Sequence, residues 1–174
     1  AMLVVLCDLF HDARVNNTSI PLNIGFIGAY LKQEFPSDVQ VKLFKSSAKL
    51  SKWISENDSP FIIGFSNYSW NVRLNLHFME MVRNKFPETM IFQGGPHIRT
   101  DKEGIAEYLK KNPLVDFYVM LEGEFSTAEL VENFLKFGCK EELKSSQPLL
   151  TGVAYLNNGQ LLYEQRLSSK LDIE

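Results

Sequence analysis

Short apolar runs alternate with amphipathic stretches along this chain. The runs occupy residues 3–7, 39–44, 61–65, 89–92 and 115–120, and each has the length and the Val, Ile and Phe content of a β-strand. Runs 3–7 and 61–65 are apolar throughout, as expected for parallel strands that are covered on both faces. Run 39–44 alternates between apolar and polar residues, which favours a place at an edge of the sheet.

Five helices are predicted between and after these strands. Apolar residues recur at helical spacing in residues 24–35, 50–54 and 74–82. Capping-box patterns at residues 100–103 and 126–129 predict the starts of the fourth and fifth helices. Repeated strand–helix alternation predicts an α/β fold with a doubly wound, mostly parallel sheet. Right-handed crossovers favour the flavodoxin-like (Rossmann-like) strand order 2-1-3-4-5.

The pattern changes after Pro148. Apolar residues in 150–156 and 160–164 flank Asn157-Asn158-Gly159, which is typical of a β-hairpin with an Asn-Gly turn. We therefore expect an α/β domain over residues 2–147 and a C-terminal β-hairpin extension over residues 148–165. The polar residues 166–174 look like the start of a linker.

Composition restricts the possible partners and location. With 174 residues, 45% of them hydrophobic, the chain can bury one core without disulfides or metal. A net charge of −3 without a cluster of basic residues argues against a nucleic-acid partner. No apolar run approaches the ~20 residues of a membrane span. No signal-peptide pattern precedes the first strand, so we expect no membrane association and a cytoplasmic location.

Unusual residues gather in the loops that follow the predicted strands. Ligands of doubly wound folds bind at this carboxyl edge of the sheet. The loops contain Ser66-Asn67-Tyr68-Ser69, Gly94-Gly95-Pro96-His97 and Glu122-Gly123-Glu124, whereas the loops at the opposite edge hold ordinary turn residues. This asymmetry predicts a small-molecule site at the carboxyl edge.

Each of these candidates has a functional and a structural interpretation. The two glycines would let a large ligand lie against the backbone, or would only form a tight turn. The two serines would hydrogen-bond a ligand or cap a helix, and His97 would contact the ligand or a local backbone group. The two glutamates would accept hydrogen bonds from ligand amides and repel a phosphate, or would only line a solvated turn.

Several common catalytic and binding motifs are missing. No Gly-x-Gly-x-x-Gly follows the first strand, and there is no Walker loop. Ser66 and Met120 stand where a phosphoacceptor domain carries Asp and Lys. Cys7 and Cys139 lack the spacing of a metal or redox motif, and no Ser-His-Asp triad has a recognisable context. We therefore predict no catalytic residue and no metal ligand.

Four motifs in register resemble the N-terminal cobalamin-binding domain of radical S-adenosylmethionine enzymes. They are Pro21-Leu22, Gly64-Phe65-Ser66, Gly94-Gly95-Pro96-His97, and Asp116 followed by Glu122-Gly123-Glu124. The resemblance covers residues 2–140. It is greatest to the magnesium-protoporphyrin IX monomethyl ester oxidative cyclase-like group and to related methyltransferases.

The resemblance implies that cobalamin is bound by the loops at the carboxyl edge. The implied cofactor-binding residues are Ser19, Pro21, Leu22, Ser66, Asn67, Ser69, Gly94, Gly95, Pro96, His97, Glu122, Gly123 and Glu124. Methionine synthase-type domains carry Asp-x-His-x-x-Gly after the first strand, and that histidine binds cobalt. Here Asp8-Leu9-Phe10-His11 has one residue more and lacks the glycine, so cobalamin is expected without a protein histidine ligand.

The resemblance also implies a larger parent enzyme. A C-terminal radical domain, which would be this domain's partner, would hold a [4Fe–4S] cluster and S-adenosylmethionine. The two cysteines of this chain cannot hold that cluster, so we expect the chain alone to be catalytically incomplete. The parent's reaction, ring closure or methyl transfer, stays open, as do its substrate and oligomeric state.

Two alternatives to a cobalamin module remain at this stage. The first is a degenerate module that binds no cobalamin and serves as a docking or substrate-positioning domain. The second is a flavin-binding domain whose first loop holds the phosphate through Thr18 and Ser19.

Overall fold

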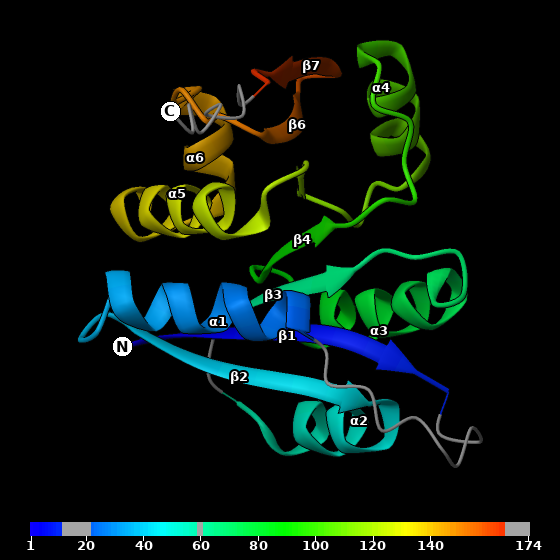
Figure 1. Cartoon of the computed structure of the whole chain (residues 1–174), viewed down its shortest axis with the longest axis vertical. Helices are drawn as coiled ribbons and strands as arrows, with labels where there is room; N and C mark the ends of the chain where they lie inside the picture. Colours follow the sequence, from blue (N-terminus) through cyan, green and yellow to red (C-terminus); the bar gives the residue numbers. More distant parts are fainter. Residues whose placement is uncertain (12–21, 59–60, 166–174) are drawn as a thin grey trace, which may run out of the picture.

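A computed structural model of the chain describes residues 1–11, 22–58 and 61–165. Within these residues, seven strands form one sheet in the order β2-β1-β3-β4-β5-β6-β7 (Figure 1). The first five are parallel, and their predicted order 2-1-3-4-5 is confirmed. The strands are β1 (Met2–Phe10), β2 (Val39–Ser46), β3 (Phe61–Ser66), β4 (Met90–Gly94), β5 (Phe117–Val119), β6 (Val153–Asn157) and β7 (Gln160–Tyr163).

Helices cover both faces of the sheet. One layer contains α2 (Ser47–Glu56), α3 (Val72–Lys85) and α4 (Lys102–Lys111), and the other contains α1 (Leu22–Glu34), α5 (Gly123–Phe137) and α6 (Lys140–Ser146). Successive residues of β1 serve opposite cores: Val5 and Cys7 pack with the first layer, and Val4 and Leu6 with the second. None of the helices in the described residues is long and apolar enough to cross a membrane.

Two helices begin at positions other than the capping boxes predict. Helix α4 is capped by Asp101, whose carboxylate accepts a hydrogen bond from the Gly104 amide. Helix α5 begins at Gly123 with Glu122 as its N-cap, four residues before the predicted cap Ser126, and Ser126 and Thr127 are buried inside the helix. The Ser126 hydroxyl donates to the carbonyl of Thr151. This capping-box prediction was wrong because a tertiary contact uses the hydroxyl that the motif assigns to a cap.

The predicted hairpin is present and extends the main sheet. Strand β6 pairs antiparallel with β5, and β7 pairs antiparallel with β6. The turn places Asn158 and Gly159 at φ values of 50° and 79°, as the Asn-Gly pattern predicts. The short helix α6 was not predicted. Residues 166–174 lie outside the described residues, so the linker there stays a prediction.

Candidate functional site

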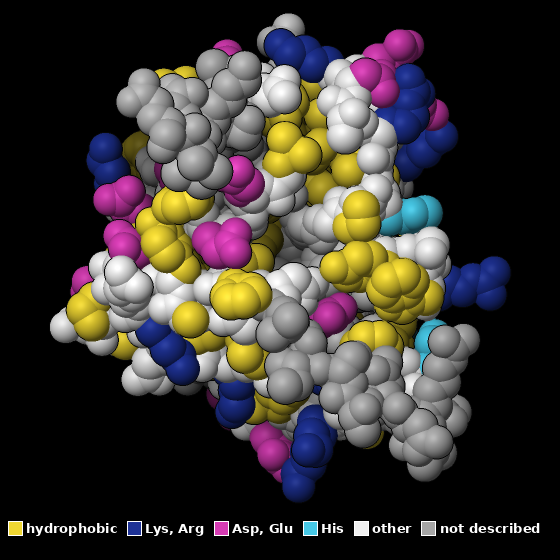
Figure 2. All heavy atoms as spheres, viewed as in Figure 1, with side chains coloured by type: hydrophobic (Ala, Val, Ile, Leu, Met, Phe, Trp, Pro, Cys, Tyr) yellow, Lys and Arg dark blue, Asp and Glu magenta, His cyan; other side chains and the backbone are white. Residues whose placement is uncertain are grey.

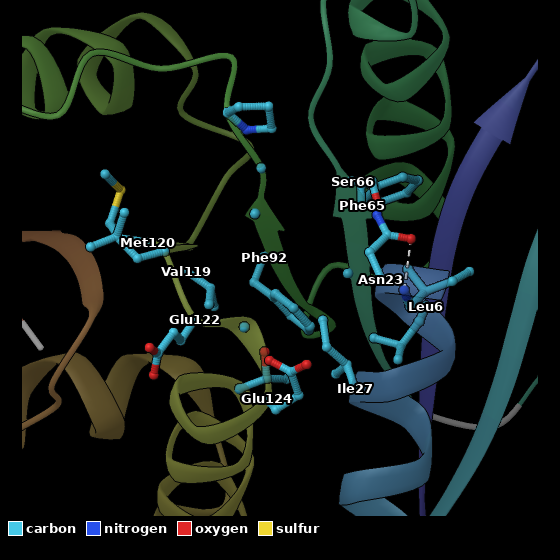
Figure 3. A pocket seen from close by; sticks show the side chains of 18 of the residues that line it. Leu6, Asn23, Ile27, Phe65, Ser66, Phe92, Val119, Met120, Glu122 and Glu124 are labelled. Carbon is cyan, nitrogen blue, oxygen red and sulfur yellow. Dashed lines mark hydrogen bonds between the residues drawn. The ribbon is translucent and has the colours of Figure 1, made fainter. Parts of the chain in front are cut away.

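A cavity of about 500 Å³ opens at the carboxyl edge of the parallel strands (Figure 3). Its walls come from α1, from the ends of β3, β4 and β5, and from the first turns of α5. This volume lies within the ~300–1,000 Å³ range of small-molecule sites. The cavity therefore stands where doubly wound folds bind their ligands.

The inner part of the cavity is apolar because Phe92 lies across Gly64. A Cβ atom at Gly64 would lie 2.3 Å from the Phe92 ring, so only glycine leaves room for this packing. Ile27 of α1 and Val119 of β5 also line the cavity. Side chains from three elements thus form a mostly hydrocarbon surface.

Polar groups from β3 and α1 form one side of the cavity. The Asn23 amide donates to the Ser66 hydroxyl at 3.0 Å and lies 3.2 Å from the Tyr68 hydroxyl. The Ser66 carbonyl accepts hydrogen bonds from the buried amides of Asn71 and Asn75, both at 2.9 Å. The end of β3 is therefore fixed from both sides, which holds the Ser66 hydroxyl at the cavity wall.

The loop after β4 has an unusual backbone that Asn67 supports. Gly95 has a φ of 127°, and a Cβ there would lie 2.7 Å from the Asn67 carbonyl oxygen. The backbone N–H of Asn67 donates to the Gly94 carbonyl at 2.6 Å, and the backbone N–H of His97 donates to the backbone carbonyl of Asn67 at 3.3 Å. Glycine is therefore needed at position 95 for the two loops to approach this closely.

Two buried tyrosines lie beneath the same loop. The Asn67 side-chain nitrogen lies 3.1 Å from the hydroxyls of both Tyr108 and Tyr118. These hydroxyls donate onward, Tyr108 to Gln93 at 2.6 Å and Tyr118 to the Gly95 carbonyl at 2.7 Å. Burial raises the pKa of Tyr108 to about 12 and raises that of Tyr118 as well, so both remain hydrogen-bond donors at neutral pH.

The α5 side of the cavity is acidic. Leu121 adopts a left-handed backbone with φ of 56°, which is rare for leucine and turns the chain sharply into α5. Glu122 and Glu124 follow and line the cavity (Figure 3). Thr127, one turn further, also lines it, and its buried hydroxyl has no hydrogen-bond partner among the described residues.

The structure brings together part of the predicted site. Seven of the predicted residues line the cavity: Ser66, Gly94, Gly95, Pro96, Glu122, Gly123 and Glu124. Three others do not line it: Asn67 is buried beneath the loop, and Ser69 and His97 are exposed outside the cavity. Ser19 and Pro21 lie outside the described residues, and Leu22 begins α1 with its side chain undescribed. A cofactor-binding role for each stays a prediction.

Several residues that line the cavity were not predicted from the sequence, among them Asn23, Tyr68, Phe92 and Thr127. Asn23 follows the Pro21-Leu22 motif, and Tyr68 lies within the predicted Ser66–Ser69 binding loop, so the sequence could have indicated both. Phe92 and Thr127 gave no such signal, because the sequence places Phe92 in a strand and Thr127 in a capping box. Both prove to line the cavity.

Asp116, which belongs to one of the resembling motifs, lies at the opposite edge of the sheet. Its carboxylate accepts hydrogen bonds from Arg83 at 2.8 Å and from the Ile91 amide at 2.9 Å, and Lys144 lies 3.6 Å away. This buried cluster joins α3, β4 and α6 at the start of β5. It holds the fold together and does not contact the cavity.

Sequence comparison relates the chain to known enzymes. No protein-family model matches it. It is 27% identical over 118 residues to the cobalamin-dependent radical SAM methyltransferase TokK from Streptomyces tokunonensis. It is 26% identical over 118 residues to the 2-(S-pantetheinyl)-carbapenam-3-carboxylate methyltransferase of Streptantibioticus cattleyicolor. Both relatives are named as methyltransferases. Each match covers 64% of this chain and 16% of the relative, so the chain matches about a sixth of their length.

Solved structures share the fold. The radical S-adenosylmethionine methyltransferase TsrM from Kitasatospora setae, with cobalamin and a [4Fe–4S] cluster bound, superposes with a TM-score of 0.60 at 13% identity. That match covers 95% of this chain and 31% of TsrM. The cobalamin-dependent S-adenosylmethionine radical enzyme OxsB gives a TM-score of 0.60 at 15% identity, covering 94% of this chain and 22% of OxsB. The predicted resemblance to radical S-adenosylmethionine enzymes is confirmed.

Proposed function

We propose that this chain is the cobalamin-binding module of a radical S-adenosylmethionine enzyme, and that the parent enzyme is a methyltransferase. The cavity at the carboxyl edge of the sheet carries this proposal. It is supported by the likeness in sequence to the cobalamin-dependent enzyme TokK and by the likeness in fold to TsrM, which was solved with cobalamin bound. The named relatives favour methyl transfer over the ring closure of the cyclase-like group. The degenerate docking module is not favoured.

The residues present fit cobalamin chemically. Cobalamin has a broad apolar ring rimmed with amides and a nucleotide tail. The hydrocarbon surface around Phe92 suits the apolar parts, and Gly94 and Gly95 let a large ligand lie against the backbone. Glu122 and Glu124 are acceptors for amide N–H groups. The unpartnered hydroxyl of Thr127 would gain a hydrogen bond from such a ligand.

Bound cobalamin would supply cobalt chemistry that no side chain of this protein can supply. The chain's own residues would bind and orient it. The fixed end of β3 holds Ser66, the network under Gly95 holds the glycine loop, and the turn at Leu121 presents the acidic residues. A cluster and S-adenosylmethionine would be bound by a further domain of the parent, which would make this chain catalytically incomplete.

The exposed residues around the cavity support a covering partner domain. Leu121, which lines the cavity, is 67% exposed, and Phe125 in the first turn of α5 is 50% exposed. Figure 2 shows hydrophobic side chains gathered on this face, with Lys and Arg toward its outline. We propose that the parent's radical domain covers this face and retains the cofactor.

We also propose that cobalt has no histidine ligand from this chain. The chain has three histidines, His11, His77 and His97, and none of them lines the cavity. Electron paramagnetic resonance of the Co(II) form should show no nitrogen splitting from a protein imidazole. Splitting that disappears in a His11→Ala or His97→Ala variant would contradict this.

The proposed function is tested by titrating the 174-residue chain with hydroxocobalamin. Binding should shift the visible spectrum, and the cofactor should co-elute with the protein in gel filtration. Flavin mononucleotide, titrated in parallel, should not bind. Absence of cobalamin binding at millimolar cofactor would refute the proposal, and tight flavin binding would favour the flavin alternative.

A matched pair of variants locates the binding site. Ile27→Trp places a bulky side chain in the cavity from α1, and binding should be lost. Ala29→Trp places the same side chain on the exposed surface of the same helix, and binding should be kept. Equal binding by both variants would show that cobalamin does not use this cavity.

A further inference from the structure

All the charged side chains in the described lining of the cavity are acidic. Glu122 and Glu124 both line the cavity, and none of its described lining residues is Lys, Arg or His. No ion pair or hydrogen bond from another described residue engages either carboxylate. Among the described residues, nothing neutralises these two charges.

The fold stabilises these two charges where they stand. Glu122 is the N-cap of α5 and Glu124 lies in its first turn. The amino end of a helix carries a partial positive charge, which favours carboxylates at these positions. The positive end of α5 is thereby matched by the protein's own side chains, so it does not form an anion site for a ligand.

A second polar group on the same wall indicates a ligand with hydrogen-bonding groups. Thr127 is fully buried, and its hydroxyl has no partner in the described structure although it lines the cavity. A buried hydroxyl without a partner costs about 1–3 kcal/mol, so folds rarely keep one without a use. The α5 wall thus offers two carboxylate acceptors and one free hydroxyl to the same ligand.

We infer that Glu122 and Glu124 select a corrin ring whose side chains are amides over one whose side chains are free carboxylic acids. This inference rests on the proposed function. Amide N–H groups donate to carboxylates, and hydrogen bonds to a charged acceptor are about twice as strong as neutral ones. Free carboxylates on the ring would instead be repelled by these like charges.

The test compares cobinamide with cobyrinic acid, both in the dicyano form. Cobinamide keeps the amide rim and lacks the nucleotide tail, and cobyrinic acid carries carboxylic acids in place of the amides. The chain should bind cobyrinic acid at least about tenfold more weakly than cobinamide at low salt. This gap, the ratio of the two dissociation constants, should become smaller in high salt.

Charge-neutral variants connect the selectivity to the two residues. In the Glu122→Gln/Glu124→Gln double variant the gap should shrink to about threefold or less, because glutamine keeps the shape without the charge. The Glu80→Gln/Glu132→Gln variant removes two exposed charges on α3 and α5 that do not line the cavity, and the full gap should remain.

The outcomes separate the inference from the proposed function. If cobalamin and cobinamide bind but cobyrinic acid binds equally well, the inference is refuted and the proposed function stands. A gap that persists undiminished in the Glu122→Gln/Glu124→Gln variant also refutes it. If no corrin binds, both are refuted together.

Discussion

The hydroxyl of Tyr118 donates a hydrogen bond to the carbonyl oxygen of Gly95 at 2.7 Å. Tyr118 belongs to β5, whereas Gly95 lies in the loop after β4, so the bond joins neighbouring strands at the cavity edge. The same Tyr118 hydroxyl accepts a hydrogen bond from the side-chain amide of Asn67, which lies in the loop after β3. Two loops of the carboxyl edge and strand β5 therefore share one hydrogen-bond network.

Tyr118→Phe should destabilise the protein by removing a hydrogen bond at the carboxyl edge of the sheet. Loss of the hydroxyl leaves the Gly95 carbonyl without its donor, so the free energy of unfolding should fall by about 1–3 kcal/mol in urea denaturation. Corrin binding should weaken as well. Tyr155→Phe, on β6, removes a hydroxyl without a hydrogen bond to a described residue, and serves as the control. Equal effects of the two variants would rule out a special role for the Gly95 contact.

Thr127→Val and Ser126→Ala should act in opposite directions on stability. The Thr127 hydroxyl is buried without a described partner, so replacing it with a methyl group should raise the free energy of unfolding by about 1 kcal/mol. The Ser126 hydroxyl donates to Thr151, so its loss should lower stability by about 1 kcal/mol. Thermal and urea unfolding measure both. A destabilised Thr127→Val variant would mean that the hydroxyl already has a partner.

Gly64→Ala should destabilise the protein because the new methyl group would collide with Phe92. Overpacking of this kind costs about 1–3 kcal/mol. Gly25→Ala is the contrasting variant: it lies in α1 with open space around a Cβ, and should gain about 0.4–1 kcal/mol. Combining Gly64→Ala with Phe92→Leu should restore part of the lost stability. If the double variant is no more stable than Gly64→Ala alone, the collision with Phe92 is not the cause of the destabilisation.

Asp8→Asn should stabilise the protein at neutral pH and have little effect in acid. Asp8 is 6% exposed, and burial raises the pKa of its carboxyl, an effect that Lys45 partly offsets. Since the folded pKa lies above the unfolded one, stability falls as pH rises between them. The penalty is absent below the unfolded pKa, near 3.9, and fully present above the folded one.

The check on Asp8 is a series of urea denaturations from about pH 3 to pH 8 on both proteins. The advantage of Asp8→Asn should grow through the acid range and then level off. An advantage of constant size at every pH would show that ionisation of Asp8 is not its cause.

The sequence by itself determined the fold class, the order of the parallel strands and the edge that carries the cavity. Apolar runs of strand length separated by helical stripes admit few other arrangements. The Gly94-Gly95-Pro96 and Glu122-Gly123-Glu124 segments were identifiable as cavity residues because they follow strands directly. Parallel strands bring such segments to one edge.

Only the tertiary structure decided which side chains face the cavity and which support it. Asn67 and Ser66 are sequence neighbours, yet Ser66 lines the cavity and Asn67 is buried in the network under Gly95. Thr127 stands within the predicted capping box at the start of a helix, yet it lies inside α5 and its hydroxyl has no partner among the described residues. These outcomes depend on contacts between residues far apart in the chain, such as Asn67 with Tyr118. Local pattern carries no information about those contacts, because they form only when the strands assemble into a sheet.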